Sequence, residues 1–188
     1  MANEEHLKIV KEGINNWNEW REKNPEIHPD LSQADLRGAT LQKINLGSSN
    51  LKECKLQFSN LTGANLENAN LSKAKLQEAC LQSTHMKSCN LSESGMLESN
   101  LQYADLENAN LEGAQFNEDT LFNQTNLKGA NLAGANLIEE KFFGANLEDV
   151  NLRMADLRGA DLRGSQLVGA DLFKADLKGA FLSNSNLA

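Results

Sequence analysis

Large apolar side chains recur at every fifth position over most of the chain. In the stretch ADLRGADLRGSQLVGADL, residues 155–172, leucine occupies positions 157, 162, 167 and 172. An α-helix places apolar side chains on one face at a spacing near 3.6 residues, and a β-strand places them at a spacing of two. A period of five matches neither element, so the pattern predicts a repeat unit of its own.

The repeat is long and has one break. It has 18 centres from Leu31 to Phe116 and, after a shift of one residue, 14 centres from Phe122 to Leu187. Of these 32 centres, 27 are Leu, two are Met and three are Phe. The residue two before each centre is small, and the residue between them is usually Asn or Asp. In an extended segment the small and large apolar side chains then face inward and the polar one faces outward.

Glycine marks the corners of the repeat. Ten of the 13 glycines lie two residues after a centre. Glycine there supplies the positive φ that the third position of a type II turn requires. Each unit is therefore predicted to be a short extended piece followed by a corner. A chain that turns the same way at every corner winds into a coil that encloses the leucine side chains.

Polar residues indicate four units per coil. At a spacing of 20, or 21 across the shift, one outward line alternates in charge, as stacked charges prefer, and another consists of amides, which hydrogen-bond along a stack. Eight coils at ~4.8 Å each predict a rod of roughly 38 Å. The charged line is Glu67, Lys87, Glu107, Lys128 and Glu148; the amide line is Asn50, Asn70, Asn90, Asn110, Asn131 and Asn151, flanked by Asp30 and Asp171.

The unit A-(D/N)-L-x-x, which covers residues 29–188, resembles the motif of the pentapeptide repeat family, which is abundant in cyanobacteria. The resemblance implies an all-β solenoid, a right-handed quadrilateral parallel β-helix, and a motif without catalytic residues or a cofactor. Family members include a regulator of heterocyst differentiation that binds a transcription factor, and fluoroquinolone-resistance proteins that mimic DNA and bind a type II topoisomerase. By analogy the first hypothesis is a non-enzymatic interaction scaffold or regulatory module, and the alternative is a DNA-mimicking modulator of a type II topoisomerase.

Residues 1–28 differ from the repeat and are expected to form a separate N-terminal cap. Their apolar residues follow helical spacing and predict one amphipathic helix that ends before two prolines. The helix is expected to shield the open end of the first coil, as caps do in solenoids. An alternative is that its tryptophans anchor a partner. The residues that define the apolar side are Leu7, Val10, Ile14, Trp17 and Trp20.

Composition and charge indicate which classes of function and which cellular compartment are expected. The net charge of −8 argues against direct nucleic-acid binding, which needs a basic surface. The three cysteines are typical of reduced intracellular thiols. No apolar segment resembles a signal peptide or a membrane-spanning segment, so a cytoplasmic protein is expected. Cys80, His85 and Cys89 have a spacing reminiscent of metal ligands, but the coil would point them in different directions, so no metal site is predicted.

The shift in phase allows two registers. If Leu121 were the centre, Asp119 would point inward at a cost of several kcal/mol. If Phe122 is the centre, Leu121 is exposed at a cost of about 2 kcal/mol. We therefore predict Phe122 as the centre, with the extra residue bulging out at 117–119. One coil later Glu140 occupies a small-residue position; it could bond Thr120, the coil could open there, or the carboxyl could titrate in a functional role.

Outward apolar residues predict an interaction face beside this bulge. Aromatic residues and Arg are enriched in interfaces, and bulges re-aim side chains near functional sites. The competing interpretations are that scattered exposed apolar residues are ordinary and that the insertion is merely tolerated. The predicted interaction face, which would bind a protein partner of unknown identity, consists of Tyr103, Leu121, Phe143, Arg163 and Phe181.

Two further expectations concern charge and assembly. Residues 127–188 carry eight acids against seven bases, and the alternating charged line interrupts any acidic stripe, which weighs against DNA mimicry. The C-terminal coil would expose Leu177, Leu182 and Leu187 and an open β-edge. Such edges pair with other chains, so end-to-end association into a homodimer is expected.

Overall fold

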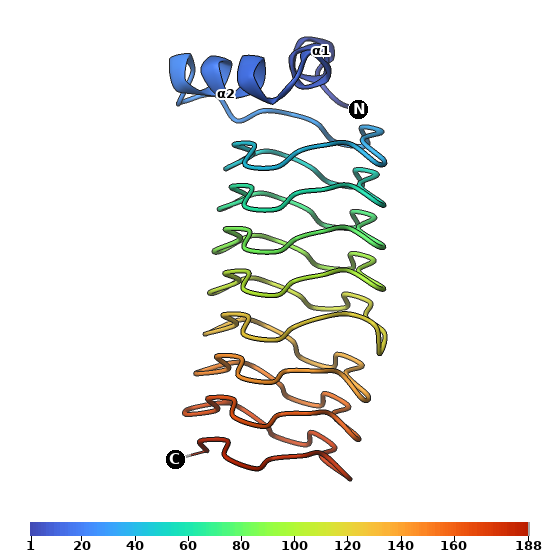
Figure 1. The fold of residues 1–188 in the computed structure, drawn as a ribbon, viewed down its shortest axis with the longest axis vertical. Coiled ribbons are helices and arrows are strands. Elements are labelled where there is room, and N and C mark those ends of the chain that lie inside the picture. Colours follow the sequence, from blue (N-terminus) through green and yellow to red (C-terminus); the bar gives the residue numbers. More distant parts are fainter. Residues whose placement is uncertain (188) are drawn as a thin grey trace.

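The computed structural model describes residues 1–187 and shows a rod with a helical end (Figure 1). Two helices, α1 (Glu4–Glu12) and α2 (Ile14–Lys23), precede a four-sided parallel β-helix. Each extended piece is so short that it pairs with the next coil as a single parallel bridge, for example Asp30 with Asn50. The bridged residues are 20 apart, or 21 across the shift, which confirms four units per coil and the predicted amide line.

The interior of the rod is a stack of the predicted centres. Leu46, Leu106 and Leu157 are fully buried, and so are small residues such as Ala64. At most of the small positions taken by Ser or Thr, the hydroxyl bonds the backbone, as in the 2.7 Å bond from Ser59 Oγ to the carbonyl of Leu56; the buried hydroxyls of Ser49 and Ser94 have no partner. The core is therefore aliphatic and filled, and the turns around it satisfy most of its hydroxyl groups.

The corners have the predicted backbone conformation. The residue two after the centre has positive φ in unit after unit, whether it is Gly38 (63°) or a residue with a side chain such as Tyr103 (61°). A left-handed conformation costs a residue with a Cβ roughly 1–2 kcal/mol. Hydrogen bonds offset that cost: the amide of Gln33 donates to the carbonyl of Lys52 in the next coil at 2.8 Å, and Ala34 N donates to Leu31 O at 3.1 Å. Glycine is therefore favoured at the corner without being required.

The shift takes the predicted register. Phe122 and Thr120 are fully buried, and Asp119 is exposed. Leu121 faces outward and bridges Asn100 on one side and Lys141 on the other. The Phe122 ring stacks on the Phe142 ring of the next coil, with centroids 4.9 Å apart. The inserted turn at residues 117–119 is closed by a 2.7 Å bond from Thr120 N to the carbonyl of Asn117.

The prediction of one N-terminal helix is wrong in a single respect. The chain breaks at Gly13, whose φ of 120° no helix contains, so the cap consists of two helices. The break turns the chain so that α2 lies across the end of the first coil (Figure 1). The cap that was predicted to be one helix is therefore formed by both α1 and α2.

Side chains of α2 bond the open backbone edge of the first coil. Trp17 is fully buried, and its Nε1 donates to the carbonyl of Asn45 at 2.7 Å. The amide of Asn45 donates to Asn18 Oδ1 at 2.8 Å, and Arg21 donates to the carbonyl of Gly47 at 3.0 Å. These contacts confirm the capping role, and the burial of Trp17 removes it as an anchor for a partner.

The last described coil is more open. Leu172, Leu177 and Leu182 are half-buried, and Leu187 is 55% exposed. The side chains that a following coil would cover are therefore accessible in this structure.

Candidate functional site

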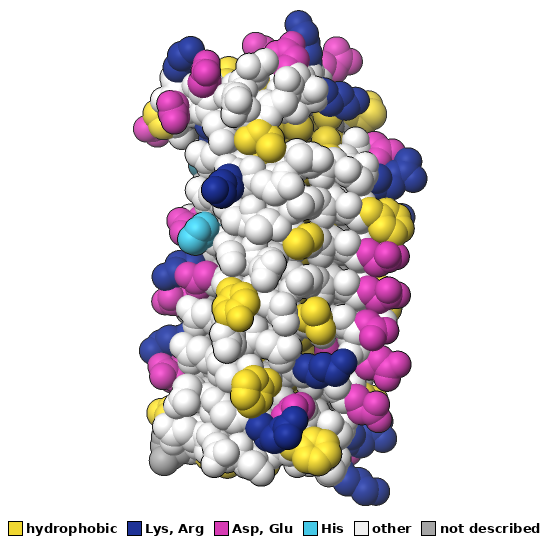
Figure 2. Space-filling model, viewed as in Figure 1, with side chains coloured by type: hydrophobic (Ala, Val, Ile, Leu, Met, Phe, Trp, Pro, Cys, Tyr) yellow, Lys and Arg dark blue, Asp and Glu magenta, His cyan; other side chains and the backbone are white. Residues whose placement is uncertain are grey.

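The predicted interaction face is accessible but not continuous. Tyr103, Phe143 and Phe181 are 55%, 51% and 57% exposed, and Leu121 is half-buried. No ring contact joins the three aromatic residues within residues 1–187. Figure 2 shows hydrophobic side chains that lie singly among polar ones on the face in view. The face therefore offers separate anchor points instead of one apolar patch.

Two members of the interaction face lie together. Arg163 pairs with Asp161 through two bonds, Nε to Oδ1 at 2.8 Å and NH2 to Oδ2 at 2.6 Å. Its guanidinium carbon lies 6.0 Å from the centre of the Phe181 ring. Hydrogen bonding from Arg163 lowers the pKa of Asp161. The pair holds the guanidinium over the aromatic ring in a fixed orientation.

Glu140 is the most unusual side chain beside the insertion. It is only 1% exposed, and its Oε2 has no hydrogen-bond partner. Of the three alternatives for Glu140, the bond to Thr120 is wrong, because the Thr120 hydroxyl pairs with Met96 O at 3.3 Å and with Asn117 Oδ1 at 3.2 Å. Burial raises the pKa of Glu140 to about 8; nearby Lys141 lowers it, and the neighbouring carboxylates raise it further.

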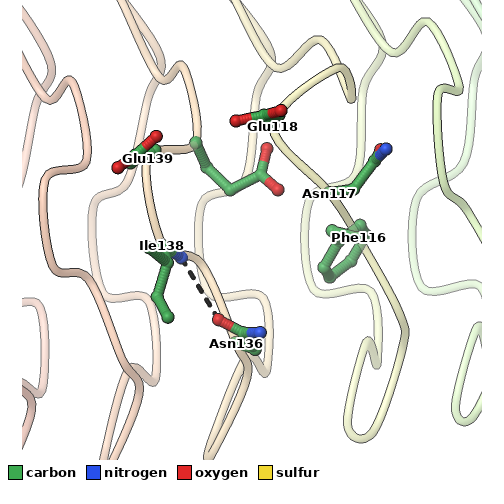
Figure 3. Close-up of a pocket in the computed structure, with 7 residues that line it drawn as sticks. Phe116, Asn117, Glu118, Asn136, Ile138 and Glu139 are labelled. Carbon is green, nitrogen blue, oxygen red and sulfur yellow. Dashed lines mark hydrogen bonds between the residues drawn. The ribbon is translucent and has the colours of Figure 1, made fainter.

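The coil opens beside Glu140, as the second alternative expected. A spacing of 21 would pair Gln115 with Asn136, yet among residues 1–187 these two form no bridge. The backbone amide of Glu98 is also irregular. Most corner amides elsewhere donate to a backbone carbonyl of the next coil, but this one donates to the side-chain Oδ1 of Asn117 at 2.8 Å. A cavity of about 370 Å³ lies in the gap (Figure 3). It is lined by Phe116, Asn117, Glu118, Asn136, Ile138, Glu139 and Glu140.

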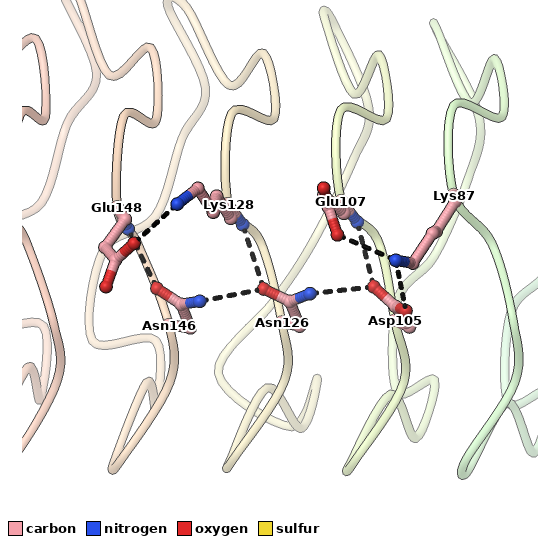
Figure 4. Close-up of polar contacts among 7 residues, drawn as sticks. All are labelled: Lys87, Asp105, Glu107, Asn126, Lys128, Asn146 and Glu148. Carbon is pink, nitrogen blue, oxygen red and sulfur yellow. Dashed lines mark hydrogen bonds and ion pairs between the residues drawn. The ribbon is translucent and has the colours of Figure 1, made fainter.

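The alternating charged line is confirmed on another side of the rod (Figure 4). Lys87 pairs with Glu107 at 2.8 Å, and Lys128 pairs with Glu148 at 2.8 Å. A second row of polar side chains runs beside it, in which Asn146 donates to Asn126 Oδ1 at 3.0 Å and Asn126 donates to Asp105 at 2.8 Å. This second row was not predicted. Its signal was available, because its members also recur at the coil spacing.

An unpaired acidic edge was also missed. Figure 2 shows Asp and Glu side chains in a column along one edge of the rod. The bridge register stacks acidic corner residues of successive coils on the side that contains the cavity. None of them forms an ion pair within the part of the chain that the structure describes. We call these residues the acidic edge: Glu78, Glu98, Glu118, Asp119 and Glu139.

The cysteines lie apart from one another. Cys54 and Cys89 are buried free thiols, and burial raises the pKa of each to about 12. Cys80 and His85 bridge different neighbours, on different sides of the coil.

Within residues 1–187 no three His, Cys, Asp or Glu side chains are arranged to hold a metal ion. Neither α1 nor α2 has the length and hydropathy of a membrane-spanning helix, and the described chain has no other helix.

Comparison with known families identifies the fold. The model of pentapeptide repeats matches the chain in eight copies, over residues 30–68, 49–87, 89–118, 118–149, 141–179 and 151–188. The chain belongs to the pentapeptide repeat family. Its four-sided coil is therefore the right-handed quadrilateral β-helix that the repeat motif implied, here with a helical N-terminal cap. No curated protein sequence matches the chain.

A solved structure of QnrB1 supports the fold assignment, and two cyanobacterial pentapeptide repeat proteins are similar in sequence. A trypsin-treated form of QnrB1, a plasmid-mediated fluoroquinolone resistance protein, is 18% identical with a TM-score of 0.64, and the match covers 85% of this chain and 87% of that one. HetL, a pentapeptide repeat protein involved in heterocyst differentiation regulation in the cyanobacterium Nostoc sp. strain PCC 7120, is 26% identical over 99% and 94% of the two chains, with a TM-score of 0.36. Rfr23 from the cyanobacterium Cyanothece 51142 is 28% identical over 91% and 97%, with a TM-score of 0.25.

Proposed function

We propose that this pentapeptide repeat protein is a non-enzymatic scaffold in the cytoplasm that binds a protein partner through the interaction face. The observation that carries the proposal is the combination of a filled, regular rod with exposed aromatic side chains beside its one irregular turn. Tyr103 and Phe143 are each more than half exposed, and both lie within one coil of the buried Phe122 that marks the shift. Free cysteine thiols agree with a reducing compartment.

Rigidity makes such a face suitable for recognition. Most corner residues before the last coil are fixed by a backbone bond to the next coil, such as the 3.0 Å bond from Gln124 N to the carbonyl of Phe143. Anchors on a fixed frame lose little conformational entropy on binding, which favours affinity. Aromatic residues and Arg are also the side chains that contribute most to binding energy in interfaces.

The test is a pair of matched double variants. Leu121→Asp with Phe143→Asp places two charges on the interaction face, whereas Phe58→Asp with Met154→Asp places two charges at exposed positions elsewhere. Both proteins should fold, because all four side chains point outward. We expect immobilised wild type and the control variant to capture the same protein from lysate of the source organism. The first variant should capture less than a tenth of that amount, and equal capture by all three proteins contradicts the proposal.

The acidic edge favours a second candidate, a DNA-mimicking modulator of a type II topoisomerase. Its carboxylates are unpaired and follow one side of the rod, and the fold is shared with QnrB1. One acid per coil gives a charge about every 4.8 Å, compared with one phosphate about every 1.7 Å of duplex DNA. The lower charge density places this candidate second. Inhibition of gyrase supercoiling at stoichiometric protein, lost in Glu78→Gln with Glu98→Gln, would favour it over the scaffold.

A further inference from the structure

The cavity beside the inserted turn has the properties of a small binding site separate from the interaction face. Its volume of about 370 Å³ lies within the range of ligand sites, roughly 300–1,000 Å³. It occupies the gap where Gln115 and Asn136 fail to pair. In a regular coil the Phe116 amide would donate to the Asn136 carbonyl, and this bond is absent from the described chain. The irregular turn thus opens a space that the repeat otherwise fills.

A buried carboxylate without a partner lines this space. In other coils the position of Glu140 holds a small residue such as Ala, and Glu140 is just as buried, at 1% exposed. Glu140 lines the cavity, and its buried Oε2 makes no hydrogen bond. Ionising this buried carboxyl group without a partner is costly, which is why burial raises its pKa. A cation in the cavity would remove that cost.

The surrounding charges are negative. Glu118 and Glu139 also line the cavity, and their carboxylates lie at the same end of it in Figure 3. The neighbouring Lys141 does not pair with the Glu140 carboxyl group. Lys141 is exposed, and its Nζ donates to the backbone carbonyl of Glu118 on the inserted turn at 3.1 Å. The chain's own alkylammonium thus binds the outside of the turn and leaves the Glu140 carboxylate unpaired.

The remaining walls select the kind of cation. Phe116 and Ile138 line opposite sides of the cavity (Figure 3), which suits an alkyl chain. The carboxylates are not grouped as metal ligands anywhere within residues 1–187. Three carboxyl groups around an apolar cleft match a planar guanidinium, which donates in several directions at once. We propose that this cavity binds a guanidinium group carried on an alkyl chain.

Binding measured by calorimetry with three probes tests the proposal. The probes are a capped Gly-Arg-Gly peptide, the same peptide with neutral citrulline in place of Arg, and agmatine, which carries a guanidinium without a peptide. We expect the Arg peptide to bind at least tenfold more tightly than the citrulline peptide. If agmatine binds as well as the Arg peptide, the site takes a free cation; if only the peptide binds, the site takes the side chain of a protein.

Variants separate the site from general attraction. Glu140→Gln should weaken Arg-peptide binding at least tenfold, and Glu118→Gln, on an exposed side chain that the core does not need, about threefold. Glu78→Gln removes an equal charge from the acidic edge outside the cavity and should change binding less than twofold. Circular dichroism confirms that each variant is folded. Equal binding of the Arg and citrulline peptides, no binding at millimolar concentration, or equal losses in Glu78→Gln and Glu140→Gln would overturn the proposal. None of these results bears on the interaction face.

Discussion

Truncation of one core centre provides the sharpest test of the inside and outside assignment. Leu106 is fully buried at the middle of the rod, and the centres above and below it, Met86 and Leu127, are also fully buried. Leu106→Ala removes three methyl or methylene equivalents and leaves a cavity. Substitutions of this kind cost about 2–5 kcal/mol, and the cost rises when the surroundings cannot collapse.

The structure places the expected cost of Leu106→Ala within that range. The coils on either side are held at a fixed spacing by backbone bonds, including the 2.7 Å bond from Leu106 N to the carbonyl of Asn126. The backbone therefore cannot close the gap, but the flexible Met86 side chain can fill part of it. We expect a loss of about 3 kcal/mol in the free energy of unfolding.

The assay is chemical denaturation followed by circular dichroism, with Gln102→Ala as the matched control. Gln102 is half-buried and outward, and its recorded hydrogen bond is from its backbone N, which alanine keeps. The control should lose less than about 0.5 kcal/mol. Equal denaturation midpoints for the two variants would refute the assignment of Leu106 to the core.

Three further predictions concern the insertion and the two ends. Glu140 has a pKa of about 8 in the folded chain and an ordinary pKa of 4.5. Between these values the folded state holds a proton that the unfolded state has lost. The stability of the wild type therefore falls as pH rises from about 5 to 8. Glu140→Gln should therefore be more stable than wild type by roughly 3–5 kcal/mol above pH 8 and no more stable below pH 4, as thermal melts across pH would show. Trp17→Phe removes the bond to the Asn45 carbonyl and should cost about 1–2 kcal/mol in denaturant titration; an unchanged midpoint would mean that the bond does not support the cap. End-to-end association through the C-terminal coil stays a prediction, and light scattering that gives a monomer mass at high concentration would contradict it.

Most of the rod was predictable because one constraint acts on every unit. Backbone pairing between coils fixes the spacing at 20 residues, so any position that repeats at 20 in the sequence must stack in space. The choice of Phe122 over Leu121 also followed from energy alone, since the other register would have buried Asp119. By contrast, the break in the cap depends on the backbone of Gly13, and helical spacing continues across it in the sequence.

The cavity and the acidic edge lay beyond the sequence for different reasons. The sequence shows that Glu140 is an unusual residue at a small position. It does not show how the Thr120 hydroxyl is oriented, and in the structure that hydroxyl bonds Met96 and Asn117 and not Glu140. Most of the acidic edge precedes residues 127–188, the last third of the chain, in which bases nearly balance acids. Charges on a solenoid act along one edge, and sorting corner residues by coil position places Glu78 and Glu98 above the inserted turn.

The most direct measurement is partner capture by a rod from which the irregularity has been removed. Deleting Asp119 and changing Glu140 to Ala converts the inserted turn into an ordinary five-residue unit, and Gln115 can then pair with Asn136. We predict a folded rod that melts at or above the wild-type temperature, because the deletion restores a backbone bridge and Glu140→Ala removes a buried carboxyl group without a partner. It should capture less than a tenth of the partner that wild type captures. Wild-type capture by this regular rod would contradict the proposal that partner binding depends on the irregular turn beside the interaction face.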